Sequence, residues 1–284
     1  MSVILIHHDY SKSELPRELF ADDSNVEFVN EWVHGEWGGF SLVQLVLNGI
    51  DQLFDRERDF DWVTFMSGQD YPTRSLFEFE ESLASVGDGA INYSDDRPLS
   101  LERYRFAYYR IPRTFESRFT HRAFFVLRIL SGFQPFLRFT TGRIGCRIGI
   151  RVRRRVLSEG LAFRKGYQWW TLSRSVLQYV RTFVRSRPEI VAWFRARVLV
   201  PDESFFQTIL SGANFSFISD DGHYARWNHA DALSPEILRS SDLAAILESK
   251  KYFGRKFDIA VDSEVLDLLD ERTVDKSRGE SQSN

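Results

Sequence analysis

Short apolar runs alternate with polar, turn-like residues in the first third of the chain. Four of them, at 3–7, 26–29, 62–66 and 90–93, have the length and composition of buried strands. Between the second and third runs, residues 40–54 place Leu42, Leu45 and Val46 at helical spacing and predict an amphipathic helix. This alternation predicts an α/β fold with a central, mostly parallel sheet flanked by helices, which binds ligands near the carboxyl ends of its strands.

The second half of the chain predicts further elements. A helix is expected at 189–197, a polar hairpin at 214–229, and a helix that Ser241-Asp242 caps and that ends near residue 250. Residues 271–284 have few apolar side chains and are expected to form a disordered tail. We therefore expect a single domain over residues 1–270.

Composition narrows the class of protein. The chain has 284 residues, of which 43% are apolar, enough for a buried core. It contains neither an uncharged apolar run of about 18 residues nor a signal-peptide pattern, so we expect a cytoplasmic protein that is at most peripheral to a membrane. Cys146 is the single cysteine, which excludes an internal disulfide and a thiolate metal cluster.

Charge is distributed unevenly. Residues 101–165 hold fifteen arginines and one lysine against three glutamates, a balance of +13, whereas the whole chain carries −3. Aromatic and aliphatic residues are interleaved with these arginines. Such a basic insert could bind nucleic acid, could lie on an anionic membrane, or could be an irregular structural insert whose arginine stems cover the core.

Candidate site residues follow two of the predicted strands. Asp9 comes directly after the first strand, and Asp70 follows the third within SGQDYP. A carboxylate at such a position can bind a nucleotide or a sugar, or can simply close a loop. His7-His8-Asp9 with Asp70 also allows a metal-dependent phosphoesterase, although no second histidine-rich cluster exists. The acidic pair of 59-DFD-61 precedes its strand, which argues against a sugar-nucleotide metal site.

Three further pairs of adjacent residues are candidates for catalysis or ligand binding. Asp202-Glu203 opens an amphipathic segment after a proline, where an acid often only offsets the helix dipole. Trp169-Trp170 could stack on a sugar or pack in the core. Arg255-Lys256 could neutralise a diphosphate leaving group in place of a metal, or could be a solvated basic pair.

The order of these motifs carries a resemblance. The segments WVTFMSGQDYPTRS (62–75), GYQWWTLSR (166–174), PDESFFQTIL (201–210) and FGRKFD (253–258) resemble the core-2/I-branching β-1,6-N-acetylglucosaminyltransferase family, which includes the peptide O-xylosyltransferases. The resemblance extends from Val3 to about Leu269 and is weakest in the basic insert. It implies a GT-A type fold, inverting transfer from a UDP-sugar to a hydroxyl, and no metal or other cofactor.

The resemblance also implies roles for individual residues. The family's catalytic base falls on Glu203, its diphosphate-binding lysine on Lys256 and its uridine-binding aspartate on Asp9, while a tyrosine near the nucleotide is replaced by His34. A second diphosphate cation falls near Leu233, which cannot serve, so Arg226, Arg239 or Arg255 would have to replace it, and we favour Arg255. Asp70 with Trp169 or Trp170 would position sugar.

Other departures point to a shorter relative. The family's first strand and helix, upstream of the Asp9 strand, have no counterpart, and the chain lacks the cysteines and anchor of animal members, so it resembles bacterial ones. We expect GlcNAc to be transferred to a glycan or lipid-linked glycan. UDP-xylose is the alternative donor, because 37-WGG-39 and RKF resemble the xylosyltransferase branch as closely. Residues 101–165 would contact an anionic membrane, and no nucleic-acid partner is expected.

Overall fold

The computed structural model describes residues 2–93, 105–152, 160–229, 232 and 234–279. Contacts divide the chain into two compact units, each assembled from three segments of sequence. The first unit comprises Met1–Asp61, Tyr93–Gln168 and Arg174–Asn214, and the second comprises Trp62–Asn92, Trp169–Ser173 and Phe215–Asn284.

The first unit opens with a parallel strand pair. Its elements are β1 (Ile4–Ile6), η1 (Arg17–Phe20), β2 (Val26–Phe28), α1 (Ser41–Asp55), β6 (Phe106–Arg110), η3 (Arg113–Phe115), α4 (Arg118–Leu130), η4 (Ser131–Phe133), β7 (Leu137–Thr140), β8 (Arg147–Arg151), α5 (Arg174–Ser186), α6 (Pro188–Arg197), η5 (Pro201–Glu203) and α7 (Phe205–Leu210). β1 and β2 pair with Ile4 opposite Val26. The predicted strands at 3–7 and 26–29 are thereby confirmed as strands, although none of their residues in β1 and β2 is fully buried. The helices predicted at 40–54 and 189–197 are confirmed as well.

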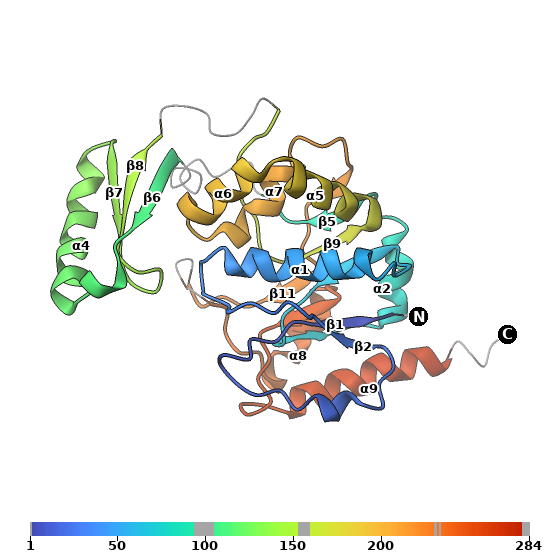
Figure 1. The fold of residues 1–284 in the computed structure, drawn as a ribbon. Coiled ribbons are helices and arrows are strands. Elements are labelled where there is room, and N and C mark those ends of the chain that lie inside the picture. The colour runs from blue at the N-terminus through green and yellow to red at the C-terminus, as the bar shows by residue number, and fades with distance from the viewer. Residues whose placement is uncertain (1, 94–104, 153–159, 230–231, 233, 280–284) are drawn as a thin grey trace. The chain divides into compact units, whose positions relative to one another are not determined.

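Four helices form the core of this unit. α5 contacts α1, α6 and α7 (Figure 1), and all six residues of α7 are buried. α1 directs the buried Val43 and Ile50 into this core, whereas Leu42 and Leu45, which the apolar spacing placed on the same face, are only half-buried. Outside the core, Asp51 of α1 accepts a hydrogen bond from Nε of Arg181 in α5 at 2.7 Å. The two helices are therefore joined by a polar contact as well as by apolar packing.

The basic insert folds as a small α/β module within the first unit. β6, β8 and β7 form an antiparallel sheet in that order, with Tyr108 opposite Gly149. α4 packs on β7 (Figure 1), and the rings of Phe124 and Phe139 meet edge to face at 5.6 Å between them. No helix among the described residues is both long and apolar enough to cross a membrane.

The second unit holds two further sheets. Its elements are β3 (Trp62–Phe65), β4 (Asp70–Pro72), α2 (Leu76–Leu83), β5 (Gly89–Ile91), β9 (Trp170–Ser173), β10 (Phe217–Ile218), β11 (His223–Ala225), η6 (Ser240–Asp242), α8 (Leu243–Glu248), β12 (Phe253–Arg255) and α9 (Glu264–Gly279). One sheet has the order β10-β5-β9-β3 and the other the order β11-β12-β4.

Strand directions confirm the α/β class with one modification. β5 and β10 are parallel, and β3 runs in the same direction, but β9 lies between β5 and β3 and is antiparallel to both. The sheet is therefore mixed, although most of its strands share one direction.

The hairpin predicted at 214–229 does not form. β10 pairs with β5, whereas β11 pairs with β12, and both pairs are parallel. Asp220 and Asp221 provide the expected turn between the two strands, because their carboxylates accept hydrogen bonds from the backbone N–H groups of Gly222 and His223. A turn therefore separates two strands within 214–229, but each of these strands finds its partner elsewhere.

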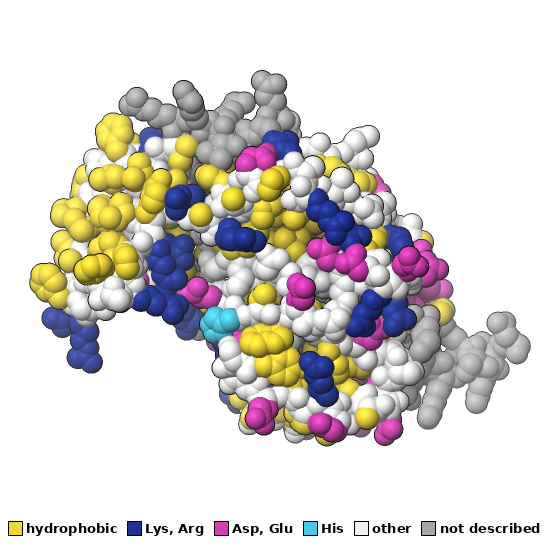
Figure 2. Space-filling view, in the orientation of Figure 1, with side chains coloured by type: hydrophobic (Ala, Val, Ile, Leu, Met, Phe, Trp, Pro, Cys, Tyr) yellow, Lys and Arg dark blue, Asp and Glu magenta, His cyan; other side chains and the backbone are white. Residues whose placement is uncertain are grey.

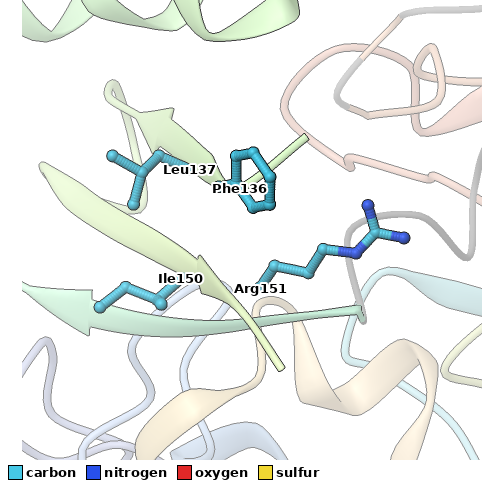
Figure 3. Close-up of a pocket in the computed structure, with 4 residues that line it drawn as sticks. All are labelled: Phe136, Leu137, Ile150 and Arg151. Carbon is cyan, nitrogen blue, oxygen red and sulfur yellow. The ribbon is translucent and has the colours of Figure 1, made fainter. Parts of the chain in front are cut away.

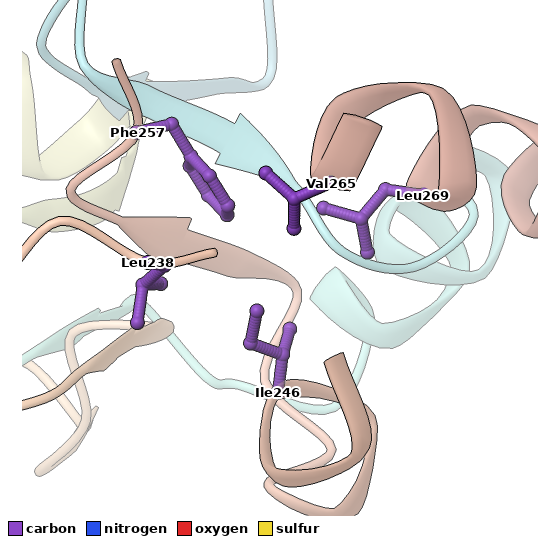
Figure 4. Close-up of a cluster of buried hydrophobic side chains, with 5 residues drawn as sticks. All are labelled: Leu238, Ile246, Phe257, Val265 and Leu269. Atoms are coloured by element: carbon purple, nitrogen blue, oxygen red, sulfur yellow. The ribbon is translucent and has the colours of Figure 1, made fainter. Parts of the chain in front are cut away.

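A buried cluster anchors the end of the chain. It consists of Leu238, Ile246, Phe257, Val265 and Leu269 (Figure 4). α8 begins after Asp242, as expected, and the Asp242 carboxylate accepts a hydrogen bond from the backbone N–H of Arg239 at 2.9 Å. α9 continues to Gly279, so a helix replaces the first part of the disordered tail predicted from residue 271, whose last residues, 280–284, lie outside the described residues.

Candidate functional site

Glu203 ends a short turn that a strained residue precedes. Val200 has φ 50°, in the left-handed region, and Pro201 then begins the turn η5. The backbone carbonyl of Glu203 accepts a hydrogen bond from Gly166 at 2.8 Å, and Nε2 of Gln207 donates to the carbonyl of Tyr167. The segment before β9 is therefore fastened along η5 and α7, which fixes the position of Glu203.

The two acids of this turn differ in exposure. Asp202 is buried, whereas the Glu203 side chain is 32% exposed. Nζ of Lys165 lies 3.3 Å from Oε2 of Glu203, and the Lys165 side chain is similarly half-exposed. Glu203 is thus the acid that solvent and a ligand can reach.

Asp9 organises the loop that follows β1. Its Oδ2 accepts the backbone N–H of Gly35 at 2.8 Å and lies 3.2 Å from both Lys12 Nζ and His34 Nδ1. Its Oδ1 accepts from the backbone and the hydroxyl of Ser11. The Ser11 hydrogen bond holds the pKa of Asp9 well below its usual range. Both carboxylate oxygens accept hydrogen bonds from within the protein, so the first role of Asp9 is to hold this loop in its conformation.

The histidines near Asp9 have different surroundings. His34 is exposed, and its Nδ1 also lies 2.7 Å from the Ser11 hydroxyl. Nε2 of His7 accepts a hydrogen bond from the backbone of Val33, and burial lowers the pKa of His7. Within the described ranges, no group of three or more His, Cys, Asp or Glu side chains is arranged to hold a metal ion.

Asp70 forms the buried centre of a second cluster, in the second unit. Its side chain is fully buried and lies 2.9 Å from Nη1 of Arg255, its neighbour across the β4–β12 pair. Nε1 of Trp169 donates to Asp70 at 2.9 Å, and Nε2 of His223 lies 3.5 Å away. Burial would raise the pKa of Asp70, but the interactions with His223 and Arg255 outweigh it, and the pKa lies below its usual value.

Trp169 and Trp170 have separate environments. The guanidinium of Arg255 stacks on Trp169 with its Cζ 3.5 Å from the ring centroid, so one face of this ring is covered. Trp170 is buried and stacks on Phe65 of β3. The sugar-binding role considered for Trp170 is therefore incorrect, because its side chain is buried in the core.

The cations considered for binding the diphosphate differ in whether an acidic side chain already engages them. Arg255 is buried against Asp70 and Trp169, which corrects its assignment as the partner of Lys256. Arg226 is engaged by Glu236 and Asp242. Lys256 and the exposed Arg239 have no acidic partner within the part of the chain that the structure describes. Leu233, where the family resemblance places the second diphosphate cation, lies outside the described residues.

Lys256 and Arg239 belong to neighbouring backbone segments. The backbone N–H of Leu238 donates to the carbonyl of Lys256 at 2.8 Å. Leu238 and Phe257, the residues next to the two cations, are both buried in the C-terminal cluster (Figure 4). These two anchors hold the segments in register, and the cations beside them remain available to an anion.

Sequence reasoning missed two residues of these clusters. In the sequence, Lys165 is only one more cation of the basic insert, and His223 is an isolated histidine with no recognisable motif around it. Their contacts with Glu203 and Asp70 join residues far apart in the chain, so no local pattern could have indicated them. Arg239 had been considered, without any feature to place it ahead of Arg255.

Comparison with known proteins gives a consistent result. The family model described as Core-2/I-Branching enzyme matches residues 3–247, which include Glu203 but end before Lys256. Xylosyltransferase 2 of Canis lupus familiaris is 26% identical over 290 residues, covering 93% of this chain and 30% of that protein. Xylosyltransferase oxt of Drosophila melanogaster is 24% identical over 294 residues, covering 95% of this chain and 30% of that protein. The chain thus spans about a third of the length of these relatives.

Proposed function

The chain belongs to the core-2/I-branching enzyme family, and we propose that it is an inverting, metal-independent glycosyltransferase that moves a sugar from a UDP-sugar to a hydroxyl of a glycan acceptor. The observation that carries this proposal is the half-exposed Glu203 carboxylate beside Lys165, in a PDE turn that the rest of the unit holds in place.

Glu203 acts as the general base. In an inverting transfer, the acceptor oxygen attacks the anomeric carbon in line with the bond to UDP, and a base takes the hydroxyl proton as that bond breaks. A base must be within reach of the acceptor hydroxyl. Glu203 meets this condition through its exposure, and the buried Asp202 does not.

Lys256 and Arg239 neutralise the leaving UDP. Negative charge grows on the diphosphate as the sugar departs, and fixed cations can stabilise it as a metal does in other transferases. Arg239 replaces Arg255 in this proposal, because the charge of Arg255 is already directed at Asp70. A guanidinium and an ammonium on adjacent segments suit phosphate oxygens as a fork and a point charge.

The remaining candidates keep supporting roles. Asp9 orders the turn at residues 33–36 through Gly35, and the exposed His34 on that turn contacts the nucleotide. Asp70 holds Arg255 and Trp169 in place, and the uncovered side of Trp169 contacts sugar.

Two UDP-sugars are candidates for the donor. UDP-GlcNAc is the donor expected from the resemblance to branching enzymes. UDP-xylose is the second candidate, favoured by the relatives that are named xylosyltransferases.

UDP release from a panel of UDP-sugars tests the proposal, with glycan and peptide acceptors supplied in turn. We expect acceptor-stimulated release from UDP-GlcNAc or UDP-xylose that persists in EDTA. Activity that chelation abolishes and Mn²⁺ restores would contradict the role of fixed cations. Failure of every donor to release UDP or to raise the melting temperature would contradict the function itself.

A further inference from the structure

The basic insert exposes an unusually apolar surface. Phe119 is 81% exposed and Phe133 is 90% exposed, and Val126, Ile129, Leu130 and Phe136 are exposed with them. We call this set the insert surface. Figure 2 shows hydrophobic side chains gathered over α4. Contiguous apolar patches on a soluble protein mark sites of interaction with another surface.

The geometry of α4 excludes a role for this surface in the core of the insert. Phe124 is the buried residue of the helix and faces the sheet through Phe139. At about 100° per residue, Phe119, Val126 and Ile129 lie on the opposite side of α4. The helix therefore has apolar residues on both faces, and among the described residues only the Phe124 face has a partner.

Charge on the insert is predominantly positive. Residues 105–152 contain ten arginines and one acidic residue, Glu116. Arg118, Arg122 and Arg128 lie on α4 itself, and none has an acidic partner among the described residues. Glu116 is occupied elsewhere, since it accepts a hydrogen bond from the backbone of Cys146.

Two open pockets on the insert combine apolar side chains with an arginine. One, of about 330 Å³, is lined by Phe136, Leu137, Ile150 and Arg151 (Figure 3). The other, of about 500 Å³, places Arg122 beside Phe125 and Val126. Each pocket thus offers one guanidinium next to apolar walls, a combination that suits a molecule with an anionic head and an apolar tail.

We propose that the insert docks on an anionic lipid bilayer, with Phe119, Val126, Ile129, Leu130 and Phe133 entering the interface and the α4 arginines contacting lipid phosphates. Apolar side chains that enter the acyl boundary and arginines that bind headgroups are the two sources of affinity in interfacial helices. A second copy of the chain is a poorer occupant, because it would bring like charges together. Nucleic acid would use the arginines but would leave the aliphatic side chains unburied.

Co-sedimentation of the full-length protein with vesicles tests this proposal. We expect binding to phosphatidylcholine vesicles that contain about one third phosphatidylglycerol, at least about tenfold weaker binding to pure phosphatidylcholine, and loss of the difference in about 0.5 M salt.

Paired variants separate the two contributions. Phe119→Ser with Phe133→Ser should abolish vesicle binding, and Arg118→Gln with Arg122→Gln should remove the preference for anionic lipid. Leu19→Ser, at another highly exposed apolar position of the first unit, and Arg185→Gln, at an arginine outside the insert, are the matched controls and should bind as the parent does. Unchanged circular dichroism and UDP release would establish that each variant is folded.

Several results would overturn the proposal. Equal binding to neutral and anionic vesicles, or full binding by the phenylalanine variant, would exclude this surface as the membrane contact. Self-association that the phenylalanine variant abolishes, without any vesicle binding, would identify a second copy as the occupant. Oligonucleotide binding that survives the phenylalanine substitutions, without vesicle binding, would identify nucleic acid instead.

Discussion

Arg255 and Asp70 face each other across adjacent antiparallel strands, 2.9 Å apart and almost entirely shielded from water. The guanidinium also stacks on Trp169, which itself donates to Asp70. The three side chains therefore form one closed unit, in which the arginine expected to bind a ligand instead stabilises the fold.

Asp70→Ala should destabilise the protein strongly. Removing one partner of a buried ion pair leaves the other charge unpaired and typically costs about 3–5 kcal/mol. Chemical denaturation measures this cost. The double variant Asp70→Leu with Arg255→Met should lose much less than the sum of its single variants. Additive losses would show that the two side chains contribute independently.

Acid should weaken the same contact. The pKa of Asp70 is lowered on folding, so its contribution is complete above the unfolded pKa of about 4 and is lost as pH falls through the lower folded value. The free energy of unfolding should decrease below about pH 4, and Asp70→Asn should decrease less over that range. Parallel pH profiles for the two proteins would contradict the assignment.

The elements that sequence predicted well depend on local patterns. The helix at 41–55 and the strands of the first third follow from apolar spacing, which a chain of any topology would show. Contacts between distant segments were not predictable in the same way. β10 and β11 flank a turn but pair with β5 and β12, and nothing within 214–229 encodes those partners.

The candidate site shows the same division. The sequence suggested Glu203 through its motif, but exposure and Lys165 distinguish it from Asp202. Trp169 and Trp170 are neighbours in sequence, yet Trp169 donates a hydrogen bond to Asp70 and Trp170 is buried in the core. Arg255 and Lys256 differ likewise, since only Arg255 lies opposite Asp70 in the strand register.

Lys256→Gln should weaken donor binding. Loss of a cation that contacts the diphosphate removes a charge-assisted interaction, and we expect about a tenfold rise or more in the KM for the UDP-sugar. Lys256→Arg should recover part of the affinity, because it keeps the charge. Arg226→Gln is the control, since Glu236 and Asp242 already engage that arginine, and its KM should not change.

Lys165→Gln should reduce turnover moderately. The Lys165–Glu203 pair is partly exposed, and such pairs contribute about 0.2–1 kcal/mol, which corresponds to a few-fold change in rate. Lys165→Arg should restore the rate. A KM for the donor that rises while kcat stays constant would show that Lys165 binds the donor and does not position the base.

Glu203→Gln is the most direct test of the proposed chemistry. The substitution keeps the size of the side chain but removes its ability to accept a proton, so transfer should fall by roughly a hundredfold or more. Isothermal titration should show UDP-sugar binding close to that of the parent, and Asp202→Asn serves as the comparison at the buried neighbour. A Glu203→Gln variant that transfers sugar at the parental rate would contradict the assignment of Glu203 as the catalytic base.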